Sequence, residues 1–355
     1  THFSVQWKKN SFLPDLAIKR LLQAQSNGFF LNISGRVLVL GCVQPELLKA
    51  LNVHEVIVCH PEKAIIRRAK DLNFFTLINK SKITKLKLLR SVGASIVYIT
   101  KSRRETLLNI AMAFSATNRK GNIIITGGKK EGIEYTLGEL KKIIEPCSVL
   151  SKAHGKIGLF KRPERIPQVI RNWKKQGRLL KNNSGFVTAA GTFSEQFVDN
   201  GSQLLADQFL GKLYGNVVDL GAGWGFLSAK AIKYSPQIEN ITLIDSNSNA
   251  LKSAKINVRS TKAKFAWLDL ECDILSMKNV DHVLMNPPFH KGQKIDFLLG
   301  LFFLNIAKDI LKKGGTLWMV FNRNSPYEKS VKSLFPNYEF LKETKGYKVI
   351  SAKKF

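Results

Sequence analysis

The sequence predicts an α/β protein made of two tandem, doubly wound units, and three observations carry this prediction. An apolar run at 217–220 breaks into glycines and is followed by a helical pattern at 226–234. At 355 residues, the chain exceeds what one hydrophobic core usually organises. Four segments of the first half recur in the same order in the second half, which indicates a duplicated unit. The pairs are 37–40 and 217–220, 55–58 and 241–244, 96–99 and 282–285, and 123–125 and 317–320.

The glycine turn of the second half reads Asp219-Leu-Gly-Ala-Gly-Trp-Gly. A strand, a glycine turn and a helix form the corner of a doubly wound sheet where nucleotides and nucleosides bind. Gly221, Gly223 and Gly225 carry no Cβ, so the backbone can approach a ligand closely there. The third glycine comes one position earlier than in the dinucleotide pattern G-x-G-x-x-G. This spacing resembles motif I of the methyltransferases that depend on S-adenosylmethionine.

Carboxylates follow the two neighbouring strands. Asp245 ends the strand at 241–244, where it can accept both ribose hydroxyls of an adenosine. Asp269 follows Trp267 at the close of a further strand. In folds of this kind that carboxylate commonly meets the adenine amino group, and tertiary capping is the alternative role.

A segment ahead of the glycine turn is expected to cover the site. Phe193 and Asp199 lie where a lid over the cofactor or the base would sit. Ser202 or Asn200 is expected to cap a helix at 203–209. The residues that we assign to cofactor binding are Asp219, Gly221, Gly223, Gly225, Asp245, Asp269, Phe193 and Asp199.

The catalytic prediction rests on Asn286-Pro287-Pro288-Phe289, which follows a strand at 281–285. Two prolines fix a rigid turn at the carboxyl end of that strand, where open α/β sheets place their ligands. The turn resembles motif IV of methyltransferases that act on planar amino groups. The Asn286 side-chain oxygen and the Pro287 carbonyl can accept both N–H groups of such an amine and hold its nitrogen in line with a methyl group. Phe289 offers a face on which a base can stack.

The composition indicates a polyanionic partner. The chain has 56 Lys and Arg against 26 Asp and Glu, a formal net charge of +30, which is typical of nucleic-acid-binding proteins. Four scattered cysteines without nearby histidine pairs predict neither a metal site nor disulfides, as in a reducing cytoplasm. The longest apolar run, at 297–304, is too short to span a bilayer, so we expect a cytoplasmic protein without a membrane partner.

The first copy has lost the residues that carry chemistry. Its glycine turn retains Gly41 alone, Cys59-His60-Pro61 replaces the acidic strand end, and Thr100 to Arg103 replace the Asn-Pro-Pro-Phe turn. We therefore expect a degenerate domain at 1–165 with an RNA-binding or structural role. A basic linker is expected at 166–184, and the overlapping stretch at 152–181 carries ten Lys or Arg and one acid. The catalytic domain is expected at 185–355.

Several motifs together resemble the bacterial ribosomal RNA guanine-N2 methyltransferases, the small-subunit enzyme of the RsmC type and its large-subunit relative. These motifs are Phe193-Ser194 with Asp199 and 201–205, Asn286 to His290, the turn at 322–327 that contains Arg323, and 347–349. The resemblance is specific across 185–355 and architectural before it. It implies two tandem Rossmann-like class I methyltransferase domains, the N-terminal one degenerate. It also places His290, beside Phe289, at the base or a phosphate of the substrate, and Arg323 at a phosphate, with a surface salt bridge as the alternative role of Arg323.

The resemblance implies transfer of a methyl group from S-adenosylmethionine to the exocyclic N2 of a guanine in ribosomal RNA, in the small subunit by preference. A large-subunit substrate, an adenine N6 or a protein glutamine are alternatives, although enzymes of the last two kinds usually carry Tyr where Phe289 stands. A non-enzymatic assembly factor is disfavoured, because Asp219, Asp245 and Asn286 are intact. The partner is then ribosomal RNA or a ribosomal subunit. A chain that contains both copies is expected to act as a monomer.

Overall fold

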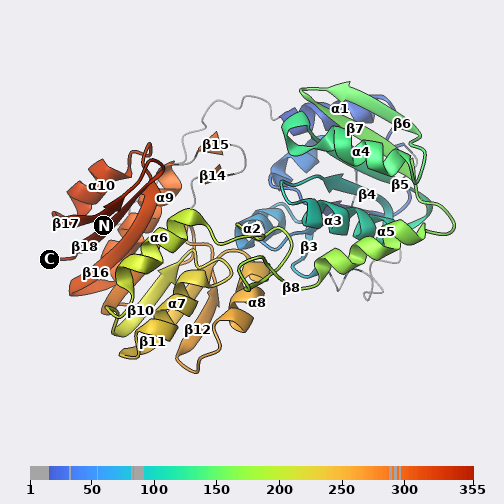
Figure 1. Ribbon diagram of the computed structural model, residues 1–355. Coiled ribbons are helices and arrows are strands. Elements are labelled where there is room, and N and C mark those ends of the chain that lie inside the picture. The colour runs from blue at the N-terminus through green and yellow to red at the C-terminus, as the bar shows by residue number, and fades with distance from the viewer. Residues whose placement is uncertain are drawn as a thin grey trace. The chain divides into compact units, whose positions relative to one another are not determined.

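The computed structural model describes residues 16–31, 33–53, 55–80, 83, 92–287, 290–291, 294–295 and 297–355, with the backbone alone at 290–291, 294–295 and 297. The chain forms two compact units (Figure 1). Unit 1 comprises the chain up to residue 60 together with 65–176, and unit 2 comprises 61–64 and 177–355. Within the described chain, no helix is long and apolar enough to cross a membrane.

Unit 1 contains a seven-stranded sheet in the order β3-β2-β1-β4-β5-β7-β6. The first five strands are parallel, and β7 and β6 are antiparallel to their neighbours. The strands are β1 (Arg36–Leu40), β2 (Val56–Cys59), β3 (Phe75–Leu77), β4 (Val92–Tyr98), β5 (Thr117–Gly128), β6 (Ser148–Lys152) and β7 (Gly155–Lys161). The helices are α1 (Leu16–Ser26), α2 (Lys63–Asp71), α3 (Arg103–Ala116), α4 (Ile133–Lys141) and α5 (Gln168–Trp173), with short 3-10 turns η1 (Pro45–Ala50), η4 (Lys129–Glu131) and η5 (Lys174–Gly177).

Unit 2 repeats this topology with the strand order β12-β11-β10-β13-β16-β18-β17. The strands are β10 (Gly215–Leu220), β11 (Ile238–Asp245), β12 (Ala263–Trp267), β13 (Val280–Met285), β16 (Leu311–Asn322), β17 (Asn337–Glu343) and β18 (Tyr347–Lys353). The helices are α6 (Asn200–Phe209), α7 (Phe226–Tyr234), α8 (Ser248–Asn257), α9 (Phe297–Ile310) and α10 (Tyr327–Leu334). Two small antiparallel pairs, β8 (Leu180–Lys181) with β9 (Val187–Thr188) and β14 (His290–Lys291) with β15 (Lys294–Ile295), lie outside the main sheet.

The identical strand order confirms the predicted duplication of a doubly wound unit. The central strand β10 reads as a continuous apolar run because helices cover both faces of the sheet. Val217 packs among residues of α6, α7 and α8, whereas Val218 and Leu220 pack among residues of α9 and α10 on the other face. The helix predicted at 226–234 is observed with those bounds as α7.

Two local expectations are corrected by the structure. Helix α6 begins at Asn200, and Asp199 caps it by accepting a hydrogen bond from the Ser202 N–H at 2.8 Å, so neither Asn200 nor Ser202 is the cap. The stretch expected to be a linker contains α5, because Ile170 is buried in the core of unit 1 and Trp173 packs against that core.

Candidate active site

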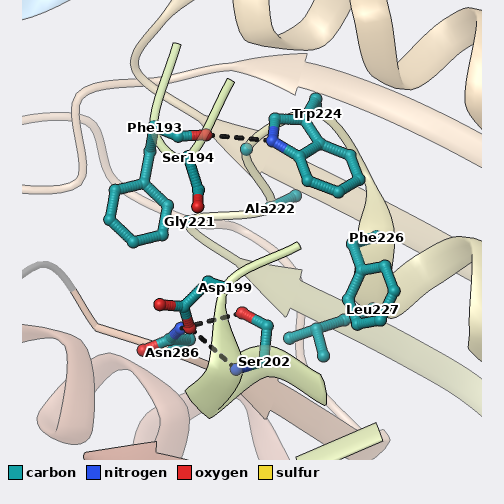
Figure 2. A pocket seen from close by; sticks show the side chains of 11 residues that line it. Phe193, Ser194, Asp199, Ser202, Gly221, Ala222, Trp224, Phe226, Leu227 and Asn286 are labelled. Carbon is teal, nitrogen blue, oxygen red and sulfur yellow. Dashed lines mark hydrogen bonds between the residues drawn. The ribbon is translucent and has the colours of Figure 1, made fainter. Parts of the chain in front are cut away.

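The carboxyl ends of β10 and β13 meet the segment before α6 around an open cavity of about 410 Å³ (Figure 2). The sheet places it where parallel strands end, as predicted for a doubly wound fold. The lining residues are Phe193, Ser194, Asp199, Ser202, Gly221, Ala222, Gly223, Trp224, Phe226, Leu227 and Asn286.

The three glycines of the turn have different structural roles, although all adopt a positive φ, +73° at Gly221, +56° at Gly223 and +87° at Gly225. A Cβ at Gly225 would lie 3.0–3.1 Å from Val258 Cγ2 and Ala254 Cβ, so this glycine lets α7 pack against α8. A Cβ at Gly223 would meet no atom of the described chain within 4 Å, so this glycine leaves space beside the cavity. The turn therefore offers its bare backbone to a ligand at Gly223.

Asp245 lies at the end of β11 and is hydrogen-bonded to the glycine turn. Its Oδ2 accepts a hydrogen bond from the Gly223 N–H at 2.8 Å, and its Oδ1 accepts one from the Asn247 N–H at 2.7 Å. Burial raises the pKa of this carboxyl above its usual value. Asp245 stands behind Gly223 rather than among the residues that line the cavity.

Asp219 is fully buried beneath the turn. Its Oδ2 accepts a hydrogen bond from the Ser228 hydroxyl at 2.6 Å, while Oδ1 has no hydrogen-bond partner among the described residues. Burial raises its pKa to about 7. A buried carboxylate oxygen without a partner, next to a glycine cradle, fits a cationic nucleoside, and S-adenosylmethionine carries both an ammonium and a sulfonium group. The residues present therefore fit this cofactor.

Asn286 is held by Asp199, the N-cap of α6, and by Ser202 in the first turn of that helix. Its Nδ2 donates hydrogen bonds to Asp199 Oδ2 at 3.0 Å and to the Ser202 hydroxyl at 2.8 Å (Figure 2). Burial and the nearby charge of Asp199 raise the pKa of Tyr347. The sequence suggested Asp199 as part of a lid, and the structure places it beside the amide of the proposed catalytic asparagine.

Trp224 connects the glycine turn to the segment at 193–194. Its indole Nε1–H donates a hydrogen bond to the Phe193 carbonyl at 2.9 Å, and the Phe193 side chain is 68% exposed at the edge of the cavity. Ser194 adopts a φ of +50°, a left-handed conformation that is uncommon for a residue with a side chain. The sequence did not predict that Trp224 and Ser202 line the site, although both residues lie within the motifs.

The structure does not bring every predicted site residue to the cavity. Asp269 is buried, its Oδ1 accepts a hydrogen bond from the Glu271 N–H at 3.3 Å, and it does not line the cavity. Its contact with the adenine amino group stays a prediction. Arg323 forms an ion pair with Glu343 at 3.2 Å and does not line the cavity. Pro288, Phe289 and the side chain of His290 lie outside the described residues, so their predicted roles stay predictions.

The fold and this site define an S-adenosylmethionine-dependent methyltransferase. In agreement, residues 183–351 match the family described as the methyltransferase small domain. Ribosomal RNA small subunit methyltransferase C of Hamiltonella defensa is 32% identical over 269 residues, which cover 75% of this chain and 78% of that protein. The protein of the same name from Buchnera aphidicola (subsp. Acyrthosiphon pisum) is 29% identical over 78% of this chain and 81% of its own length. The chain belongs to the ribosomal RNA small subunit methyltransferase C family, as its motifs predicted.

A solved structure shows the same two-unit fold. It is the 16S rRNA N2 methyltransferase (RsmC) of T. thermophilus in complex with AdoMet and guanosine. It superposes with a TM-score of 0.73 at 20% sequence identity and covers 90% of this chain and 88% of its own. The match extends over both units, so the tandem arrangement of methyltransferase-like folds is confirmed for this chain.

Proposed function

We propose that this protein transfers a methyl group from S-adenosylmethionine to the exocyclic N2 of one guanine in 16S ribosomal RNA. The observation that carries the proposal is that Asn286 and the glycine turn line the same cavity. A hydrogen-bond acceptor for a planar amine thus stands next to a cradle for an adenosyl group. The names of the relatives support the small-subunit RNA as the substrate.

The bound cofactor would supply an electrophilic methyl group on its sulfonium. The chain's own part is to present the guanine amine, a poor nucleophile because its lone pair is delocalised into the ring. Oδ1 of Asn286 accepts one N–H, and the carbonyl of Pro287 accepts the other. Both contacts orient the nitrogen and favour the pyramidal geometry of the transition state. Phe289 is proposed to stack on the base.

Unit 1 is proposed to serve RNA binding or the architecture of the protein, without a cofactor of its own. At Gly41, which corresponds to Gly221, an added Cβ would lie 2.5 Å from the Tyr98 carbonyl and 3.2 Å from Asn109 Nδ2. Protein atoms thus fill the place beside this glycine. A chain with both units is proposed to work as a monomer in the cytoplasm, where ribosomal subunits are assembled.

The test is methyl transfer from labelled S-adenosylmethionine to small subunits, large subunits, free ribosomal RNA, DNA and a protein release factor in parallel. Nuclease digestion then identifies the labelled base. We expect N2-methylguanine in 16S RNA alone. Label in 23S RNA, in adenine or in glutamine would overturn the substrate assignment and leave the fold and cofactor in place.

A further inference from the structure

The orientation of the Asn286 amide is fixed by what surrounds its nitrogen. An amide can present either its oxygen or its NH₂ group to a given neighbour, and the two orientations have nearly the same shape. The carboxylate of Asp199 can only accept hydrogen bonds, so the group that faces it at 3.0 Å must be Nδ2. The Ser202 hydroxyl at 2.8 Å takes the second N–H. Both donors of the amide are thereby used within the protein.

This orientation matters because the substrate amine is itself a donor. With Nδ2 bound to Asp199 and Ser202, Oδ1 is the atom of Asn286 left to accept from a ligand. The reversed amide would place two N–H donors against the N–H groups of the guanine and would also turn Oδ1 towards a carboxylate. Neither contact could form a hydrogen bond, and unpaired polar groups in a partly buried site are costly, about 1–3 kcal/mol each.

Asp199 is well placed for this role because the fold holds it firmly. The same Oδ2 that contacts Asn286 accepts the Ser202 N–H at 2.8 Å in the first turn of α6. Gly201 permits the close packing: a Cβ there would lie 2.8 Å from Tyr347 Cε1 and 3.1 Å from Asp199 Oδ2. The carboxylate is thus anchored to α6 and lies next to β18 as well as the end of β13.

We infer that Asp199 and Ser202 are positioning residues for the transfer reaction, which hold the Asn286 amide so that its oxygen faces the substrate amine. The inference rests on the proposed function of Asn286 as the acceptor for that amine. Neither residue needs to touch the substrate. Asp199, which the sequence grouped with cofactor contacts, acts in this view through Asn286.

Substitutions at Asp199 can separate positioning from helix capping. Asp199→Ser keeps a good N-cap, but its shorter side chain does not reach Asn286. We expect kcat to fall by about 30-fold, the loss of one charge-assisted hydrogen bond, with KM for S-adenosylmethionine and the melting temperature nearly unchanged. Asp199→Asn keeps an acceptor oxygen without the charge, so its kcat should fall less than that of Asp199→Ser. Ser202→Ala should lower kcat roughly three- to tenfold.

The matched control is Asp207→Ala on the same helix, because Asp207 is exposed and its Oδ1 accepts a hydrogen bond from the Gln203 side chain at 2.7 Å. This variant should keep the wild-type kcat. If Asp199→Ser also keeps the wild-type kcat, Asp199 is a helix cap and nothing more, and the inference is overturned.

A second measurement tests the inference even if the substrate has been assigned wrongly. Selective ¹⁵N labelling of asparagine gives side-chain amide signals, and the signal of Asn286 is the one lost in Asn286→Ala. We expect its amide protons to exchange slowly with solvent in the wild type and at least about tenfold faster in Asp199→Ser. Equal exchange rates would overturn the positioning role. Failure of the wild type to form N2-methylguanine would instead refute the proposed function.

Discussion

The main-chain N–H of Gly223 donates a hydrogen bond of 2.8 Å to Oδ2 of Asp245, and this contact joins the glycine turn after β10 to the end of β11. The other oxygen of Asp245 accepts from Asn247, the residue that caps α8. One carboxylate therefore fixes both sides of the corner that is proposed to hold the cofactor. Its removal should affect cofactor binding through the shape of the turn as well as through any direct contact.

Asp245→Ala is expected to weaken binding of S-adenosylmethionine by roughly 1–3 kcal/mol, because the ribose hydroxyls of the cofactor and the backbone N–H groups of Gly223 and Asn247 would lose their acceptor. Titration calorimetry on the full chain measures this. Glu239→Ala is the matched control, since Glu239 is an exposed acid on the same strand. A dissociation constant unchanged in Asp245→Ala would remove this residue from the cofactor site.

Asn286→Ala is expected to abolish methyl transfer while the dissociation constant of the cofactor changes by no more than a few-fold. The reason is that Asn286 is proposed to contact the base and not the sulfonium. Single-turnover rates and calorimetry on the same preparation separate the two effects. A loss of cofactor affinity as large as the loss of activity would mean that the turn after β13 has been given the wrong role.

The sequence was most informative where a residue's role depends on its neighbours in the chain. The apolar run that contains Val217 and Leu220 predicts a strand covered on both faces. The glycine spacing after this run predicts the turn independently of residues elsewhere in the chain. The contact of Asn286 with Asp199, 87 positions apart, depends on how α6 packs beside the end of β13. No local pattern encodes that contact, so the sequence predicted Asp199 as a lid and cofactor-site residue and did not predict its hydrogen bond to Asn286.

Capping and linker positions were predicted less well for a related reason. Asp199, Asn200 and Ser202 are all good N-cap residues, and only the direction in which the chain enters α6 decides that Asp199 is the cap. In the predicted linker at 166–184, the many charged residues led to the prediction of an exposed connector, although it contains the apolar residues Ile170 and Trp173. The spacing of these two residues, which places them on one face of a helix, was the sequence signal for α5.

Gly223→Ala is expected to weaken cofactor binding more than it destabilises the fold. A residue with a Cβ pays about 1–2 kcal/mol at a left-handed φ, whatever the space around it. Gly314→Ala is the matched control in the same unit, because its φ is +77° and a Cβ there would also meet no described atom within 4 Å. Both variants should lower the melting temperature by a similar amount, and only Gly223→Ala should raise the dissociation constant. Equal dissociation constants would show that the cofactor does not approach Gly223.

Asp219 is expected to make the stability of unit 2 depend on pH. Because its pKa in the folded protein is about 7, the folded state keeps the proton while the unfolded chain has lost it near pH 4. The free energy of unfolding therefore falls as the pH rises from about 4 to about 7 and levels off above that. Between pH 5 and pH 8, the free energy of unfolding measured in urea should fall by up to roughly 3 kcal/mol more for the wild type than for Asp219→Asn. Parallel pH profiles for the two proteins would contradict this prediction.

RNA binding is expected to weaken steeply with salt if the basic stretch at 152–181 contacts phosphates. Its only acid, Glu164, already forms an ion pair with Arg119 at 3.1 Å, and Lys174 and Lys175 are exposed in η5. For about four contacts with single-stranded RNA, the logarithm of the binding constant should fall with the logarithm of the salt concentration with a slope near −3.

Replacing Lys174 and Lys175 together by alanine should reduce the steepness of that slope by about 1.4 and weaken binding at low salt most. Lys141→Ala with Lys142→Ala is the matched control, because this pair is also adjacent in unit 1 and Lys141 lies 3.5 Å from Glu145. Filter binding of a 16S RNA fragment over a range of KCl concentrations gives both slopes. A flat salt response of the wild type, or equal slopes for the two double variants, would assign the basic stretch to connecting the units rather than to holding RNA.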